Sequence, residues 1–192
     1  PLMVLLWLPL LVYLTFAVFY YVFLAVTYFA TSDRVKALAP RRRRYLLFIP
    51  AHNEEAMIGR LLASLRRVNY PDGGFETFVI ADNCTDSTAG IARRYSAKVL
   101  ERNDESRKGK GFAIEWALGK DDLDAFDAVV IADADNLIDP GFFHGLDEVI
   151  EAGSRAIQCN NCLANSGETA FTKIIHLSRT INNELYHHAK YR

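Results

Sequence analysis

Three polar clusters contain the residue types that could carry chemistry in this sequence. Their letters are PAHNEE at residues 50–55, ADNCTDST at residues 81–88 and DADN at residues 133–136. A single cluster of this kind most often forms a capping turn, because Asn and Asp favour helix starts and bends for local reasons. Three clusters that each follow a predicted strand would meet at the carboxyl edge of a parallel sheet, where such folds bind ligands.

Asp133 and Asp135 are the residues best suited to a metal ion. Two residues apart, they project from the same face of an extended segment. Their hard oxygens suit Mg²⁺ or Mn²⁺ bridged to a diphosphate, although a strand-end turn would also use this pattern. The KGKG motif at residues 108–111 favours the diphosphate, because glycines let backbone amides approach a phosphate. A solvated basic loop is the alternative for that motif.

The motifs of other nucleotide-binding folds are absent from the sequence. Dinucleotide enzymes need G-x-G-x-x-G after the first strand. Here that turn contains no glycine and carries Glu54 and Glu55, which would repel a pyrophosphate, and the full P-loop pattern is also missing. We therefore expect a phosphate held by metal after the fourth strand, with base and ribose near the first two strands.

Short apolar runs alternate with helical patterns from Tyr45 onward, which predicts βαβ units in an α/β fold with a mostly parallel sheet and helices on both faces. The predicted strands are 45–49, 77–81, 98–101, 128–132 and 156–159. A helix is predicted between the first two strands, ending before Pro71. Asp139 is predicted to cap another helix, with Pro140 at its first position. A last helix is expected over 171–189.

The first 30 residues contain no charged side chain and predict one transmembrane helix. Thirty helical residues extend about 45 Å, more than the roughly 30 Å of a bilayer core. A cleaved signal sequence has an apolar core of only about 7 to 15 residues after a basic start. We therefore interpret residues 1–30 as a membrane span.

A basic segment follows this span and predicts the orientation of the chain. Residues 31–44 hold six basic residues and one acidic residue. The positive-inside rule then places residues 31–192 in the cytoplasm of a protein of the cell (inner or plasma) membrane. Beside a span, Arg41 to Arg44 favour contact with anionic membrane lipids over nuclear localisation. A total of 22 Lys and Arg against 23 Asp and Glu argues against a nucleic-acid partner.

PAHNEE, DNCTDST, GKG followed by Phe112-Ala113, and DADN, in this order behind a membrane helix, resemble family 2 glycosyltransferases of the GT-A fold. The resemblance covers about residues 45–165. It implies a Rossmann-like, mostly parallel sheet. The implied domains are the span at 1–30, a basic juxtamembrane linker at 31–44 and the nucleotide-sugar-binding half of a GT-A domain at 45–192.

The resemblance also implies a donor site. It places nine residues around a nucleotide-sugar: Pro50, Ala51, Asn53, Glu54, Asp82, Lys110, Asp133, Ala134 and Asp135. The first four would line the nucleoside pocket, and Asp82 would contact the base, usually uracil. Lys110 would lie near the diphosphate or base, and Asp135 would bind the divalent cation, Mg²⁺ or Mn²⁺. His52 occupies a variable position and is assigned no role.

The implied function is a metal-dependent, inverting glycosyltransferase that moves a sugar from a donor such as a UDP-sugar to a growing glycan, as in bacterial exopolysaccharide synthases. The sequence does not start with Met, and no acceptor-half motif precedes Arg192. We therefore expect the acidic general base and the acceptor half beyond Arg192.

Two alternatives stay open for the function. The acceptor could be a membrane lipid instead of a glycan, or the chain could be a non-catalytic membrane subunit that keeps the fold as an interaction platform. A sugar-nucleotidyltransferase is disfavoured, because a glycine-rich basic turn would be expected after its first strand.

Overall fold

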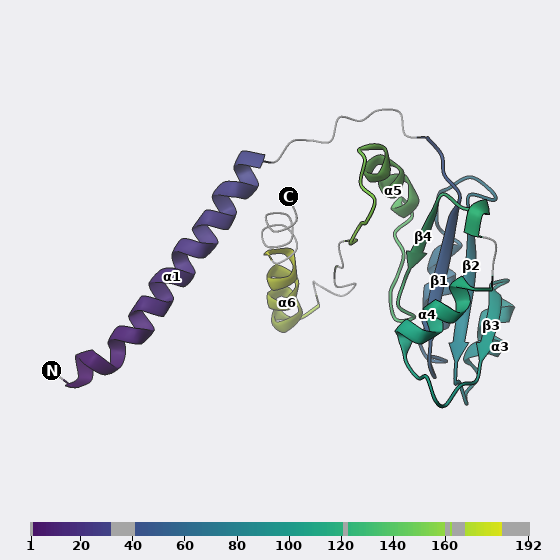
Figure 1. Ribbon diagram of the computed structural model, residues 1–192, viewed down its shortest axis with the longest axis horizontal. Helices are drawn as coiled ribbons and strands as arrows, with labels where there is room; N and C mark the ends of the chain where they lie inside the picture. The colour runs from purple at the N-terminus through teal and green to yellow at the C-terminus, as the bar shows by residue number, and fades with distance from the viewer. Residues whose placement is uncertain (1, 32–40, 121–122, 160–161, 163–167, 182–192) are drawn as a thin grey trace. The chain divides into compact units, whose positions relative to one another are not determined.

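The structure is a computed structural model that describes residues 2–31, 41–120, 123–159, 162 and 168–181 (Figure 1). The chain divides into two units, Pro1–Val35 with Ala156–Arg192, and Lys36–Arg155. Its elements are α1 (Leu2–Thr31), β1 (Tyr45–Ala51), α2 (Ile58–Leu65), β2 (Phe75–Asp82), α3 (Thr88–Arg94), β3 (Lys98–Arg102), α4 (Lys110–Leu118), the 3₁₀ helix η1 (Leu123–Ala125), β4 (Ala128–Ile131), α5 (Phe142–Glu151) and α6 (Ala170–Ile181).

The first unit contains α1, an apolar helix of 30 residues. Its stretch Trp7–Thr27, with a mean hydropathy of 2.2, is long and apolar enough to cross a membrane. The hydroxyl of Thr15 donates to the carbonyl of Leu11 at 2.8 Å, which satisfies this polar group inside the helix. The predicted N-terminal helix that could span a membrane is therefore present.

The second unit is built on a four-stranded parallel sheet with the order β3-β2-β1-β4. Tyr45 at the start of β1 pairs with Phe75 of β2 on one side and with Ala128 of β4 on the other. The side chains of Tyr45 to Ile49 are completely buried, as expected for a central parallel strand covered on both faces. The carboxyl ends of these strands meet at one edge of the sheet.

Helices cover both faces of this sheet, as predicted. On one face, α2 packs Ile58, Leu61 and Leu65 against the sheet core. On the other face, α4 lies across the strands (Figure 1) and buries Ala113 and Ala117 completely. Two small alanines let the α4 backbone approach the sheet closely, so the start of α4 is held beside the carboxyl ends of β1 and β2.

One predicted strand and one predicted helix start are wrong. The segment 156–159 contains no strand, and Ala156, Gln158 and Cys159 are exposed. A short apolar run becomes a strand only when a neighbouring strand supplies hydrogen bonds. The fourth helix of the sheet unit, α5, begins at Phe142 instead of Pro140, because the Asp139 carboxylate accepts a hydrogen bond from the Gly141 backbone at 2.8 Å and closes a turn first.

The predicted last helix is described only in part, as α6. The remainder of 171–189, from residue 182 onward, lies outside the described residues.

A buried carboxylate joins α5 to the amino end of β1. Asp147, 1% exposed, accepts hydrogen bonds from the hydroxyls of Tyr45 at 2.6 Å and Tyr70 at 2.9 Å. Burial raises the pKa of Tyr45, and its hydrogen bond to Asp147 raises this pKa further. Arg43 donates to Glu151 at 2.6 Å. The guanidinium of Arg43 is therefore engaged within the sheet unit, although its tract was expected to face lipid.

Replacing Asp147 by alanine is expected to lower the free energy of unfolding by about 3 kcal/mol, because the buried Tyr45 hydroxyl loses its acceptor and the partly buried Tyr70 hydroxyl keeps only the Arg43 carbonyl. Urea unfolding of the detergent-solubilised chain measures this loss. Glu148→Ala is the matched control, since Glu148 is the exposed neighbour on the same helix. Equal midpoints for the two variants would show that the Asp147 contacts contribute nothing to stability.

Candidate functional site

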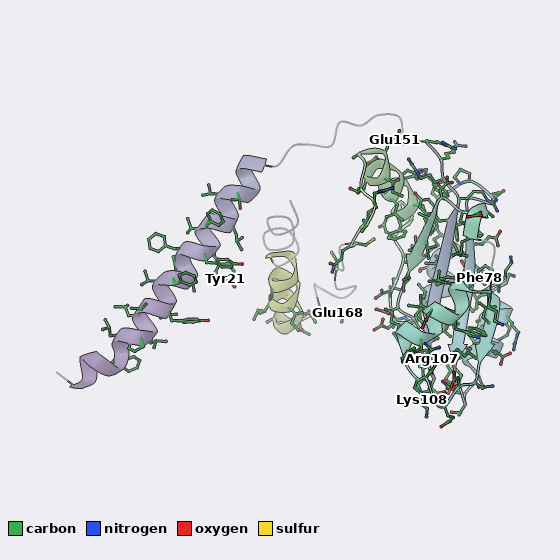
Figure 2. The ribbon with its side chains drawn as sticks, in the orientation of Figure 1. Tyr21, Phe78, Arg107, Lys108, Glu151 and Glu168 are labelled. Atoms are coloured by element: carbon green, nitrogen blue, oxygen red, sulfur yellow. The ribbon has the colours of Figure 1, made fainter. Side chains whose placement is uncertain are left out.

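A pocket of about 390 Å³ opens at the carboxyl edge of the sheet. It is lined by Pro50, Ala51, His52, Glu54, Asp82, Asn83, Lys108, Gly109, Lys110 and Ala113. These residues come from the ends of β1 and β2 and from the start of α4 with its preceding loop. Figure 2 shows Arg107 and Lys108 of that loop at one end of the sheet and Glu151 at the opposite end. The parallel topology therefore gathers two of the three polar clusters and the KGKG motif.

The structure brings most of the predicted donor residues together. Those that line the pocket are Pro50, Ala51, Glu54, Asp82 and Lys110. Those outside its lining are Asn53, Asp133, Ala134 and Asp135. Asp133 is nevertheless linked to the pocket, because its carboxylate forms an ion pair with Lys110.

Asn53 braces two loops instead of lining the pocket. It adopts a left-handed backbone conformation with φ of 54°, which Asn tolerates better than most residues. Its side-chain oxygen accepts a hydrogen bond from the Thr85 backbone at 2.8 Å. The Glu55 carboxylate likewise accepts from the Ser87 backbone at 3.0 Å. Part of the first two polar clusters therefore serves to lock their loops to each other.

Asp86 completes this brace. Its Oδ1 accepts hydrogen bonds from the backbone and hydroxyl of Thr88, and its Oδ2 accepts from the Glu55 backbone at 3.1 Å. Burial alone would raise the pKa of Asp86, but these hydrogen bonds to the ionised form outweigh it and lower the pKa from its usual value. The Glu54 backbone N–H also donates a hydrogen bond to the Thr88 hydroxyl, at 2.8 Å.

His52 lines the pocket, although it occupies a variable position in the family motif and was assigned no role. Its Nδ1 lies 2.7 Å from the backbone carbonyl oxygen of Asp82. A carbonyl can only accept a hydrogen bond, so Nδ1 must carry the proton. In the neutral ring Nε2 is then an acceptor for a ligand group in the pocket.

The Asp82 carboxylate is buried in the pocket wall, with its side chain 8% exposed. Oδ1 accepts from Arg102 at 2.6 Å and from the Asn83 side chain at 3.1 Å. Within the described part of the chain, no hydrogen bond to Oδ2 is seen. A buried carboxylate oxygen without a protein donor is suited to accept a hydrogen bond from a ligand.

The acidic pair follows the end of β4. Asp133 and Asp135 are exposed on either side of Ala134, which is 3% exposed and belongs to the core. The Ala132 backbone still donates to the Phe48 carbonyl at 3.0 Å, so β1 fixes where the pair begins. The two carboxylates are thus held on the solvent side, and that of Asp133 contacts Lys110 of the pocket lining.

The donor chemistry of this pair fits Mg²⁺ or Mn²⁺. Carboxylate oxygens are the ligands these ions prefer, and the Lys110 ammonium already places a positive charge against Asp133. Among the residues that the structure describes, no three or more His, Cys, Asp or Glu side chains are grouped closely enough to enclose a metal ion. The remaining ligands of a cation would therefore be substrate phosphate oxygens and water, as is usual for Mg²⁺.

Several pocket residues were not assigned to the donor site individually, although the sequence carried a signal for them. Lys108 and Gly109 belong to the KGKG motif, and Gly109 has a φ of 115° that requires glycine. Asn83 directly follows Asp82 and has a φ of 52°. Ala113 is part of the helix pattern after the motif. No pattern in the sequence indicates the contact of Arg102 with Asp82, because only the fold brings these two residues together.

The family described as glycosyltransferase-like family 2 has a model that matches residues 40–189. A similar protein is the beta-monoglucosyldiacylglycerol synthase of Nostoc sp., 31% identical over 133 residues, which are 66% of this chain and 28% of that protein. The 4,4'-diaponeurosporenoate glycosyltransferase of Staphylococcus aureus is 36% identical over 73 residues, 38% of this chain and 19% of that protein. The chain thus spans well under half the length of these relatives.

Two solved structures share the fold. A mannosyltransferase of Pyrobaculum calidifontis, in complex with GDP-Man and Mn²⁺, superposes with a TM-score of 0.58 at 21% identity, covering 81% of this chain and 45% of that one. TarS of S. aureus, in complex with UDP-GlcNAc, superposes with a TM-score of 0.50 at 22% identity, covering 61% and 37%. At these identities the superpositions establish the architecture of the sheet and its helices.

Proposed function

Because the chain belongs to glycosyltransferase family 2, we propose that its pocket binds a nucleotide-sugar donor, a UDP-sugar, for transfer of the sugar to a growing glycan. The observation that carries this proposal is that two chemically unlike kinds of charged group line one pocket. They are the buried Asp82 carboxylate, whose Oδ2 accepts no hydrogen bond from the residues that the structure describes, and the ammonium groups of Lys108 and Lys110. Such a pocket suits a ligand with an N–H at one end and phosphates at the other.

The base end of the donor would be read by Asp82. Uracil carries a ring N–H, and Oδ2 of Asp82 is the buried acceptor in the pocket wall that could receive it. Pro50 and Ala51 supply apolar and backbone surface at the end of β1 for the nucleoside. His52 Nε2 is a second acceptor in the same wall, because its Nδ1 proton is committed to the Asp82 carbonyl.

The phosphate end would be held by cations. Lys110 lines the pocket and reaches Asp133, so it bridges the pocket and the acidic pair. Asp135, together with Asp133, would hold Mg²⁺ or Mn²⁺. A bound cation would supply charge neutralisation for the departing nucleoside diphosphate. The Mn²⁺ in the Pyrobaculum mannosyltransferase, which shares the fold, supports this choice.

The proposed reaction is a single displacement with inversion at the anomeric carbon. The acceptor hydroxyl would lose its proton to an acidic general base. We assign this base to none of the described residues, and its expected position beyond Arg192 stays a prediction. The residues described here would bind and orient the donor.

The acceptor and the location of the reaction are also part of the proposal. The apolar helix α1 would anchor the protein in the cell membrane, with the sheet unit on the cytoplasmic side. A membrane lipid is the second candidate acceptor, because the Nostoc relative is a beta-monoglucosyldiacylglycerol synthase. Either acceptor is compatible with the same donor pocket.

Calorimetry of the detergent-solubilised chain tests the proposal. We expect UDP to bind at least about 10-fold more tightly with Mn²⁺ than after EDTA treatment, as phosphate oxygens share the ion with the carboxylates. ADP is the matched control and should bind more weakly than UDP, because adenine lacks the ring N–H that Asp82 would accept. A chain that binds no UDP with Mn²⁺ present would refute a nucleotide-sugar site.

A further inference from the structure

Arg102 is a buried arginine at the carboxyl end of β3, 5% exposed and outside the pocket lining. Its Nη1 donates to Oδ1 of Asp82 at 2.6 Å. Its Nη2 donates to Oδ2 of Asp104 at 3.0 Å and to the backbone carbonyl of Arg107 at 2.7 Å. One guanidinium therefore holds both the carboxylate in the pocket wall and the loop that leads into α4.

The loop held by Arg102 is itself folded around Asp104. Oδ1 of Asp104 accepts hydrogen bonds from the backbones of Ser106 at 3.0 Å and Arg107 at 3.1 Å. The Ser106 hydroxyl also donates to this carboxylate and, with the charge of Arg102, lowers the pKa of Asp104. The Arg107 carbonyl directly precedes Lys108. The hydrogen bonds from Arg102 to Asp104 and to the Arg107 carbonyl, here called the tether, therefore position the start of the Lys108–Lys110 segment.

We propose that Arg102 is a positioning residue that fixes the spacing between the base end and the phosphate end of the donor pocket. This inference rests on the proposed function. The planar guanidinium presents its nitrogens at a fixed separation, so Asp82 and the Arg107 carbonyl are held at a set distance. By occupying Oδ1 of Asp82, Arg102 also leaves Oδ2 for the ligand.

A purely structural ion pair makes a different prediction. If Arg102 only stabilised the fold, its loss would lower the unfolding free energy without changing how the folded pocket ranks its ligands. If Arg102 sets the spacing, its loss should weaken the binding of a long ligand more than that of a short one. Uridine would use only the Asp82 end, whereas UDP would need both ends at once.

The test compares uridine and UDP binding, both with Mn²⁺, by calorimetry of the whole detergent-solubilised chain. Asp104→Asn removes the charged acceptor of Arg102 in the loop and so weakens the loop arm, while the hydrogen bonds of Arg102 to Asp82 and to the Arg107 carbonyl keep their acceptors. We expect it to weaken UDP binding about 10-fold, the effect of one charge-assisted hydrogen bond, and to leave uridine binding unchanged. Arg102→Lys, with one nitrogen in place of a fork, should show the same pattern. Arg94→Met, an exposed arginine on α3, is the control and should change neither affinity.

The double variant Arg102→Lys/Asp104→Asn makes the test specific to the tether. If both substitutions break the same contact, the double variant loses no more UDP affinity than either single variant. Fully additive losses, or an unchanged ratio of uridine to UDP affinity in Asp104→Asn, would overturn the positioning role and leave the proposed function intact. A wild-type chain that binds neither uridine nor UDP would overturn both.

Discussion

Replacing Asp135 by alanine is expected to weaken Mn²⁺-dependent UDP binding by about 100-fold, because a cation shared with phosphate would lose a charged ligand. Uridine binding should be unchanged, since it carries no phosphate. Asp135 is exposed and makes no hydrogen bond or ion pair with the part of the chain that the structure describes. Its removal should therefore leave the free energy of unfolding unchanged. Calorimetry with UDP and an electron paramagnetic resonance titration with Mn²⁺ measure the two bindings separately.

The control for this experiment is Asp72→Ala. Asp72 is an exposed carboxylate in the turn before β2, away from the carboxyl edge of the sheet. The variant removes the same charge and should bind Mn²⁺ and UDP as the wild type does. If Asp135→Ala also keeps wild-type UDP affinity, and EDTA has no effect on either protein, the assignment of the cation to this acidic pair is wrong.

Asp82→Ala is expected to lower both the stability of the sheet unit and its affinity for UDP. The substitution removes the buried carboxylate partner of the Arg102 guanidinium, which is itself 5% exposed, and leaves it only the more exposed carboxylate of Asp104. Removing one partner of a buried ion pair typically costs about 3–5 kcal/mol of unfolding free energy. UDP affinity should fall as well, because the base loses its acceptor. Urea unfolding and calorimetry on the same preparation give the two quantities.

A double-mutant cycle separates the buried charge from the lost contact. Asp82→Ala/Arg102→Met removes both charges and should be less destabilised than the sum of the two single variants. Glu101→Ala is the matched control on the same strand, because Glu101 pairs with Arg93 in an exposed ion pair worth about 0–1 kcal/mol. A cost for Asp82→Ala as small as that of Glu101→Ala would show that the pair is not effectively buried.

The sequence alone was sufficient for the parts of the structure that depend on local patterns. A run of apolar residues from Tyr45 to Ile49 predicts a strand covered on both faces, and the structure buries every one of them. Apolar residues at helical spacing predicted α2, and a long run without charged residues predicted α1. These signals work because side-chain direction follows a fixed period in each element. The edge at which the polar clusters meet then follows from the parallel order of the strands.

Only the tertiary structure decided which of the polar residues face the pocket. Asn53 was expected to line the pocket, but its side-chain oxygen accepts a hydrogen bond from the Thr85 backbone instead. The apolar Ala113 of α4, which was not expected there, does line the pocket. A turn residue can direct its side chain to a ligand or to a neighbouring loop, and the choice depends on partners far along the chain. The predicted strand at 156–159 fails for the same reason, since a strand exists only through its neighbour.

Arg102 shows this limit most clearly. In the sequence it is a charged residue at the end of a short strand, and no spacing connects it with Asp82 or with Arg107. In the fold, the parallel pairing of β2 with β3 sets Asp82 opposite Arg102 and brings the following loop over the guanidinium. The sequence determined the types of residue at the edge of the sheet. Their partners were decided by strand order and register, which bring together groups that no local pattern relates.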